Sequence, residues 1–341
     1  MNLEDFSYDL KETQIAKFPP KIRGESRLLV LNKTTGKIVH QKYPDFINYL
    51  NAGDVLVIND TKVIKSRVMT HNENNKPVEL LLLEKHFTAI GSKGIKAIHK
   101  GRVRKSDVLY VDNSKFRFKV KEIEEGILNL EFAGNLDDLI STKGEVPIPP
   151  YLKRTATDID TERYQTVFAL NPGSVAAPTA SLNFTPQLQA KLLEKGVQIV
   201  AITLHVGYGT FSPIRVEKLE EHKMHAESYL ITAASAKKIM QAKSSGKKVV
   251  ALGTTVTRAL EHAAEHILRG EEITAEADIF IYPGYKFKII DNLITNFHAP
   301  KTTVLMLTAA FAGWDKLINA YNQAQIADYS FLSYGDSMLI N

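Results

Sequence analysis

V-Q-I-V-A-I-T-L-H-V-G-Y-G-T-F, residues 197–211, follows N-P-G-S-V-A-A-P-T-A-S-L-N-F, residues 171–184, and these two segments decide the fold class. Between them, Thr185-Pro186 has the residue types of a helix N-cap and first turn, and Gly196 is a typical helix stop. Residues 197–206 are mostly apolar, which predicts a buried strand. Polar residues and glycines flank that strand, and such a strand end is a typical place for a substrate pocket in an α/β fold.

The same alternation of helices and strands continues to the C-terminus. We expect helices over 233–245, 254–268 and 302–312, and strands over 248–252, 279–282 and 289–294. Two further strand-like runs, 27–31 and 54–58, come early in the chain and are expected to join the same sheet. This order of elements predicts a layered α/β domain.

Residues 61–150 have a different residue pattern. Residues 78–83 read as a buried strand, 116–121 alternate between apolar and cationic residues, and 127–132 follow a glycine turn. Short strands without a helical period predict a small barrel or sandwich, and the prolines of 146–150 predict a stiff exit. We therefore expect an α/β domain of residues 1–60 and 151–341, interrupted by an inserted all-β, barrel-like domain of residues 61–150.

Composition limits the class of protein. The chain has 341 residues and no cysteine, which excludes disulfide frameworks and thiolate metal sites. The acidic start of the chain lacks the pattern of a signal peptide, and the apolar run 304–312 is far shorter than a membrane span. We expect a soluble, cytoplasmic monomer with no membrane contact.

Charge is unevenly distributed. Residues 61–120 contain 14 Lys and Arg against 5 Asp and Glu, although the whole chain carries a net charge of only +5. Such segregation favours a polyanionic partner, and an ordinary solvated surface is the alternative.

Two strand ends carry small residues that suit a ligand. His205 is followed by Gly207 and Gly209, which let backbone N–H groups approach a ligand, although a plain tight turn explains the same pattern. Gly253-Thr254-Thr255 opens a helix whose free N–H groups attract carboxylate or phosphate, with Arg258 one turn further on, and an ordinary threonine cap is the alternative.

Histidines supply the candidate acid and base groups. His222, His225 and Glu227 lie close together in the sequence, but their spacing does not match a metal motif, so we expect no metal. A His–Glu pair also suits a general base near neutral pH, and surface histidines on a loop are the alternative. Asn296 and His298 follow another strand and are expected to face the same cleft.

The chain resembles the S-adenosylmethionine:tRNA ribosyltransferase-isomerases of queuosine biosynthesis over nearly its full length. The segments that carry the resemblance are 5–6, 26–29, 59–64, 149–151, 162–167, 171–211, 222–227, 253–258, 282–284, 295–300, 310–313 and 333–336. The resemblance implies an α/β domain interrupted by a β-barrel. It also implies that the ribosyl moiety of S-adenosylmethionine, a consumed co-substrate, is transferred to a 7-aminomethyl-7-deazaguanine base in tRNA and isomerised, giving epoxyqueuosine, adenine and methionine without a metal.

The resemblance also assigns residues. We expect His205, His225 and His298 to share the proton transfers, with Glu227 orienting one of them; which histidine does which is open. The substrate-binding residues implied are Asp60, Pro178, Thr179, Ser181, Asn183, Gly207, Gly209, Thr210, Thr254, Thr255, Arg258 and Asn296. Among these, Thr254, Thr255 and Arg258 are candidates for the methionine carboxylate. The cationic residues expected to bind tRNA phosphates are Lys100, Arg102, Arg104, Lys105, Lys115, Arg117 and Lys119.

Two residues depart from the family pattern T-A-G-L-H-F, because Ser181 replaces a glycine and Asn183 replaces a histidine. Asn cannot exchange a proton near pH 7. Two alternatives to the ribosyl transfer therefore stay open: a paralogue that uses S-adenosylmethionine on a different base or RNA, and a catalytically silent RNA-binding relative.

Overall fold

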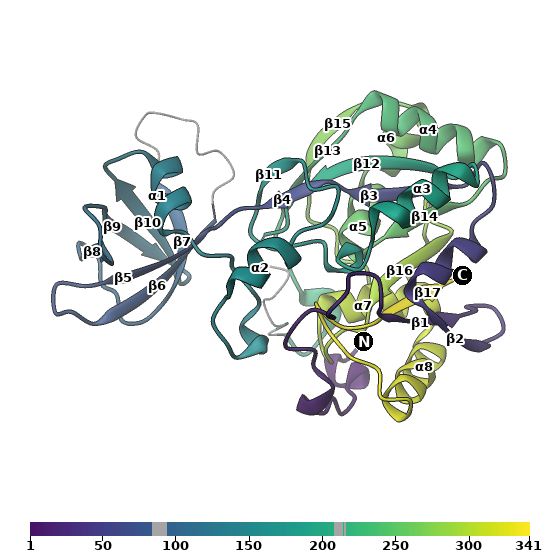
Figure 1. Ribbon diagram of the computed structural model, residues 1–341, viewed down its shortest axis with the longest axis horizontal. Helices are drawn as coiled ribbons and strands as arrows, with labels where there is room; N and C mark the ends of the chain where they lie inside the picture. The colour runs from purple at the N-terminus through teal and green to yellow at the C-terminus, as the bar shows by residue number, and fades with distance from the viewer. Residues whose placement is uncertain (84–93, 208–213, 215) are drawn as a thin grey trace.

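The computed structural model describes residues 1–83, 94–207, 214 and 216–341. Within these residues, a nine-stranded sheet with its helices forms a large body, and a closed six-stranded barrel forms a smaller one beside it (Figure 1). The described helices include none long and apolar enough to cross a membrane.

Strands from before and after the barrel are neighbours in the large sheet. The sheet order is β15 (Ile273–Ala277), β13 (Glu227–Ile231), β12 (Gln198–Leu204), β3 (Val55–Asn59), β14 (Val249–Leu252), β16 (Asn292–Asn296), β17 (Ser337–Ile340), β1 (Arg27–Leu31) and β2 (Ile38–Lys42). The early strand β3 lies between β12 and β14 and is parallel to both. The prediction that the barrel interrupts one α/β sheet is therefore confirmed.

Helices cover both faces of this sheet, because its central strands are apolar on both sides. In β14, Val249 and Ala251 belong to one core cluster, whereas Val250 and Leu252 belong to the other. Helix α3 (Pro186–Glu194) packs on the second cluster. The first cluster is covered by α4 (Ala233–Ser244), α5 (Thr254–His262), α6 (Ala264–Arg269), α7 (Thr303–Ala312) and α8 (Trp314–Ile326).

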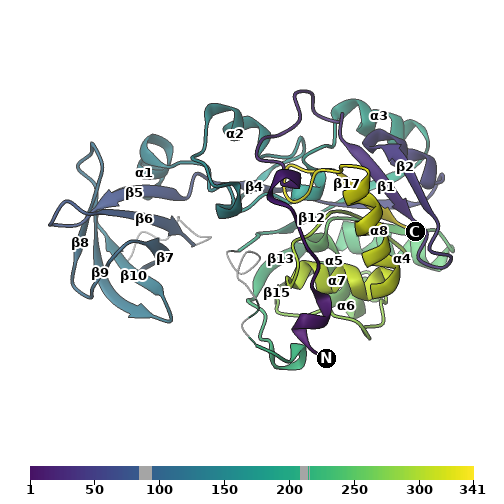
Figure 2. The ribbon, with the colours of Figure 1, turned by 90° about the horizontal axis from the view of Figure 1, so that it is seen from below.

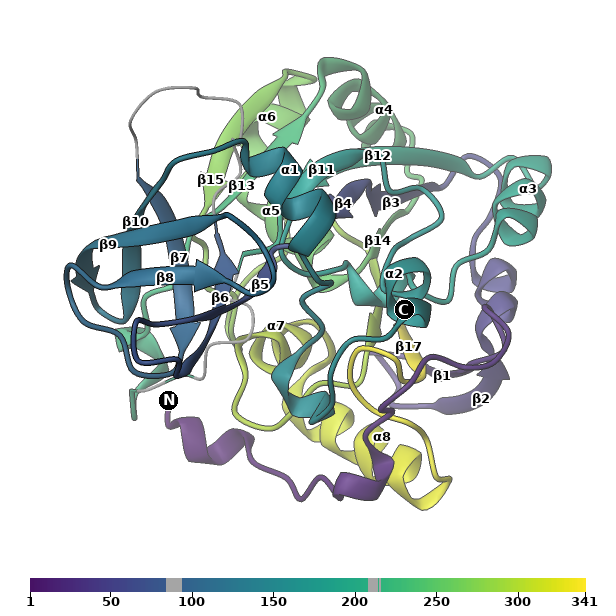
Figure 3. The ribbon, with the colours of Figure 1, turned by 60° about the vertical axis from the view of Figure 1, so that its left-hand side comes forward.

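The barrel closes in the order β10 (Ile127–Phe132), β7 (Ile95–Lys100), β6 (Pro77–Leu82), β5 (Arg67–His71), β8 (Val108–Val111) and β9 (Arg117–Glu124). Helix α1 (Leu136–Lys143) packs on it through the fully buried Leu139. Strands β8 and β9 lie on the side of the barrel away from the large body (Figures 2 and 3).

The connection between the bodies is extended on both sides. Strand β4 (Thr61–Val63) leaves the large sheet and pairs in parallel with β11 (Asn171–Ser174). Helix α2 (Asp158–Arg163) lies between the barrel and the large sheet (Figure 1).

Two predicted elements are wrong. Residues 279–282 form no strand; Ile281 is buried in the core, and the carbonyl of Ile279 accepts from Arg258 Nε instead of joining a ladder. The helix predicted over 254–268 is divided at Ala263, where α5 ends and α6 begins. Alanine favours a helix interior, so the sequence carries no signal for this break.

Candidate functional site

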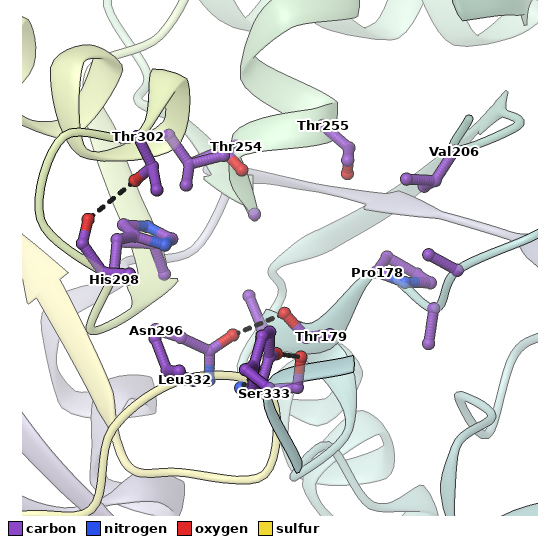
Figure 4. Close-up of a pocket in the computed structure, with 18 of the residues that line it drawn as sticks. Pro178, Thr179, Val206, Thr254, Thr255, Asn296, His298, Thr302, Leu332 and Ser333 are labelled. Carbon is purple, nitrogen blue, oxygen red and sulfur yellow. Dashed lines mark hydrogen bonds between the residues drawn. The ribbon is translucent and has the colours of Figure 1, made fainter. Parts of the chain in front are cut away.

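A cavity of about 510 Å³ opens at the carboxyl ends of the parallel strands β14 and β16. Gly253 follows β14, Asn296 ends β16, and Val206 follows β12, so three strand ends meet at this cavity (Figure 4). Ligands bind at such strand ends in open α/β sheets. Leu3, Tyr151 and Ser333, from distant parts of the chain, complete the wall.

The start of α5 forms one polar wall. Gly253 has φ +109, a conformation that L side chains rarely adopt, and it precedes Thr254 and Thr255, which both line the cavity. The Oγ1 atom of Thr255 is buried and has no hydrogen-bond partner in the described part of the chain. This hydroxyl and the first N–H groups of α5 suit a polar or anionic group of a ligand.

Asn296 and Thr179 form a second polar wall (Figure 4). Thr179 Oγ1 donates to Asn296 Oδ1 at 2.8 Å, and Asn296 Nδ2 donates to the carbonyl of Asp336 at 3.4 Å. Asn296 is 2% exposed, so these bonds fix its amide.

His298 lines the cavity beside this pair. Its Nε2 lies 2.9 Å from Thr295 Oγ1, its backbone N–H donates to the Tyr321 hydroxyl, and its carbonyl accepts from the Tyr8 hydroxyl. Burial lowers the pKa of His298 to about 3. The imidazole is therefore neutral at pH 7.

Glu227 and Arg258 form a buried ion pair. Glu227 is 1% exposed and Arg258 6% exposed. Arg258 also donates to the carbonyls of Ala277 and His225, and Glu227 Oε1 accepts from the N–H of Gly207 at 3.0 Å. The pair fixes the chain just after β12, and neither residue lines the 510 Å³ cavity.

The other two histidines lie outside this wall. His205 Nδ1 is 2.8 Å from Thr61 Oγ1, and the ring packs so closely on Gly173 that a Cβ there would lie 2.9 Å from His205 Cε1. His205 immediately precedes the wall residue Val206. His225 is exposed. Burial lowers the pKa of His222, and the nearby charge of His225 lowers it further.

Three other predicted binding residues belong to the framework around the cavity. Asp60 accepts from Asn171 Nδ2 at 3.0 Å and Thr203 Oγ1 at 2.6 Å. Ser181 and Asn183 are buried, and Asn183 Nδ2 donates to the Gly335 carbonyl at 3.3 Å. None of the three lines the cavity. Of the predicted set, Pro178, Thr179, Thr254, Thr255, Asn296 and His298 line it, whereas Gly209 and Thr210 lie outside the described residues.

Tyr151 and Ser333 share a hydrogen bond at the cavity wall, and neither was among the predicted site residues. Burial raises the pKa of Tyr151 to about 12, although its bonds with Ser333 act the other way. Both residues stand in segments that carry the family resemblance, and that was the signal available for finding them.

The described residues include no group of three His, Asp or Glu side chains arranged to hold a metal ion.

The predicted tRNA-binding residues lie on or beside the barrel, and all are exposed: Lys100, Arg102, Arg104, Lys105, Lys115, Arg117 and Lys119. Arg117 and Lys119 alternate along β9 with the buried Phe118 and Val120, as the sequence pattern predicts. Lys100 also lines a second cavity, between the two bodies.

Comparisons with known proteins agree with this architecture. The family described as "Queuosine biosynthesis protein" matches residues 3–340. The S-adenosylmethionine:tRNA ribosyltransferase-isomerase of Pelodictyon phaeoclathratiforme is 51% identical over 345 residues, and that of Staphylococcus epidermidis 44% over 346, with complete coverage of both chains in each case. The crystal structure of the S-adenosylmethionine tRNA ribosyltransferase from Thermotoga maritima is 32% identical, covers 99% of this chain and 100% of its own, and has a TM-score of 0.57. The chain therefore belongs to the queuosine biosynthesis family of S-adenosylmethionine:tRNA ribosyltransferase-isomerases.

Proposed function

We propose that this enzyme transfers the ribosyl moiety of S-adenosylmethionine to a 7-aminomethyl-7-deazaguanine base in tRNA and isomerises it, releasing adenine and methionine and giving epoxyqueuosine. It acts as a cytoplasmic monomer and consumes S-adenosylmethionine without a metal. The observation that carries the proposal is the 510 Å³ cavity, which combines an apolar lining with a helix N-terminus and a neutral histidine. A cavity of this size lies in the range of small-molecule sites.

The two polar walls suit different parts of S-adenosylmethionine. The start of α5, with the unpartnered Thr255 hydroxyl, suits the methionine carboxylate, since the helix dipole and free N–H groups favour negative charge. The guanidinium of Arg258 is bound to Glu227 and does not line the cavity. Arg258 therefore supports this wall only indirectly. The amide of Asn296 and the neutral His298 provide donors and acceptors for the nucleoside.

Proton transfer from the ribose needs a general base other than His298. The sulfonium acidifies the ribose C5′ protons, and a general base works best with a pKa near the working pH. A pKa of about 3 makes His298 a poor base but a good neutral hydrogen-bonding partner for the adenine. We assign the base to His205, beside the wall residue Val206, and a positioning role to Glu227, which holds Gly207 two residues further on.

The test is to incubate the protein with S-adenosylmethionine and tRNA carrying the aminomethyl-deazaguanine base, and to quantify adenine and the modified nucleoside by mass spectrometry. We expect both products from the native chain and about 100-fold slower turnover from His205→Gln. His266→Gln is the matched control, because the His266 side chain is 42% exposed on α6 and does not line the cavity.

The two alternatives give different results in this experiment. Adenine without epoxyqueuosine would favour a paralogue that acts on another base or RNA. Neither product, with tRNA still bound, would favour a catalytically silent RNA-binding relative.

A further inference from the structure

A second cavity, of about 530 Å³, lies between the barrel and the α/β body. Its charged lining residues are four cations and two carboxylates: Arg67, Lys100, Lys153, Arg154, Glu79 and Glu145. Pro150 lines both this cavity and the site described above, and the adjacent Val175 and Ala176 line one cavity each. The two cavities therefore share a wall at Pro150 and at residues 175–176.

An exposed aromatic ring stands beside this second cavity. Phe18 is 56% exposed, and among the described residues it is the only aromatic side chain in the exposed class. Its ring lies over the guanidinium of Arg154, with 4.2 Å between Arg154 Cζ and the ring centroid. The guanidinium covers part of the ring, and the exposed remainder is available for stacking on a base.

The support beneath the ring is rigid. Arg154 donates to both carboxylate oxygens of Asp160, each at 2.7 Å, and its Nε donates to the carbonyl of Lys17 at 2.8 Å. Burial alone would raise the pKa of Asp160, but hydrogen bonds from Arg154, Tyr334 and Thr157 hold it well below its usual range. The carboxylate thus stays charged and keeps the guanidinium in place.

Two lysines that line the second cavity can reach a phosphate. Lys100 lines the cavity and has no ion-pair partner in the described part of the chain. Among the described residues, Lys153 pairs only with the exposed carboxylate of Glu12, at 2.9 Å, and its side chain is 63% exposed. A pair this exposed is easily exchanged for a phosphate.

We propose that this second cavity and the Phe18–Arg154 stack bind a single-stranded segment of the tRNA substrate, next to the base that enters the catalytic cavity. A base adjacent to the reacting one stacks on the open face of Phe18, and its phosphates contact Lys100 and Lys153. Single-stranded RNA is recognised by stacking on aromatic rings and by cationic contacts to its backbone, which is the combination found here. The proposal rests on the function proposed above, because Pro150 lines both cavities and the segment would lie beside the reacting base.

The test uses the full chain with the aminomethyl-deazaguanine tRNA and compares Phe18→Ala with Phe18→Tyr. We expect Phe18→Ala to raise the Kd and KM for tRNA about tenfold, with kcat and the KM for S-adenosylmethionine unchanged, since stacking of one base contributes about this much. Phe18→Tyr keeps the ring and should restore native values. Ile22→Ala is the matched control, because Ile22 is 59% exposed on the same segment but is not aromatic.

Salt dependence separates stacking from charge. The loss in Phe18→Ala should persist from 50 to 300 mM salt, whereas Lys100→Ala should weaken binding mainly at low salt. A native Kd for tRNA in Phe18→Ala, with its unfolding midpoint unchanged, would overturn the proposal. Native chain that binds tRNA but forms no adenine would instead contradict the proposed function, because the Kd measurement does not depend on turnover.

Discussion

The 510 Å³ cavity and the outer face of the barrel place their polar groups in opposite ways. In the cavity, several polar side chains are fixed by partners from distant segments, as Thr179 fixes Asn296 and Ser333 bonds Tyr151. On β9, Arg117 and Lys119 extend into solvent and alternate with buried residues of the same strand. Recognition of phosphate needs only charge near the surface, whereas the chemistry of a small molecule needs groups held in one geometry. The second cavity lies between these extremes, with a fixed Arg154 and exposed lysines.

Removing one member of a buried pair should affect the α/β body most strongly. Arg258→Met leaves the carboxylate of Glu227 buried without its cation, and we expect the free energy of unfolding to fall by about 3–5 kcal/mol. Chemical denaturation followed by circular dichroism measures this. The double variant Glu227→Leu/Arg258→Met should recover much of the loss, and a fully stable single variant would contradict the buried pair.

Charge reversal on the barrel should act on tRNA alone. Arg102→Glu/Arg104→Glu/Lys105→Glu is expected to raise the tRNA KM roughly 30-fold and to reduce the salt slope of binding by about three. The affinity for S-adenosylmethionine should not change. The control reverses the charge of three exposed lysines on the α/β body, Lys191, Lys237 and Lys238. If that control weakens tRNA binding equally, net charge and not the barrel face is responsible.

Acidic pH should destabilise the folded protein through the buried His298. Its folded pKa of about 3 lies below the unfolded value near 6.5, so the unfolded chain takes up the proton first. The contribution of His298 to the free energy of unfolding is therefore complete above pH 6.5. It decreases as the pH falls, by about 1–2 kcal/mol at pH 5. Urea denaturation at pH 7 and pH 5 should show this loss in the native chain and in His266→Gln, but a smaller one in His298→Gln. Equal losses in all three chains would exclude His298 as the cause.

The hydroxyl of Thr255 should matter for the co-substrate only. Thr255→Val keeps the shape but removes the unpartnered Oγ1, and we expect the KM for S-adenosylmethionine to rise about tenfold. Thr308→Val is the matched control, since the Thr308 hydroxyl is bonded within its own helix to the Val304 carbonyl. An unchanged KM in Thr255→Val would place the carboxylate elsewhere.

The departure from the family pattern at position 183 should have the smallest effect. Asn183 does not line the cavity, and its side-chain amide donates to the carbonyl of Gly335, two residues after the wall residue Ser333. We therefore expect Asn183→His to change kcat by less than about threefold, a difference below 1 kcal/mol in barrier height. A large gain in rate, measured as adenine release, would show that this residue limits the chemistry.

Local patterns in the sequence predicted the elements well where each element depends on its own residues. The strands at 27–31 and 127–132 form as predicted, and the Thr185-Pro186 start of α3 is correct. The strand predicted at 279–282 failed because its apolar residues pack in the core without joining a ladder.

The sequence by itself determined the fold class, the interruption of the sheet by a barrel, the family and the outward cationic face of β9. These depend on periodicity and on collinear motifs, which are local properties of the chain. Only the tertiary structure decided which polar residues meet. It brought Thr179, Thr255, Asn296 and His298 to one cavity. It also paired Glu227 with Arg258 and placed Phe18 on Arg154 beside a second cavity. These contacts join segments that are distant in sequence, and no local pattern encodes the distance between them.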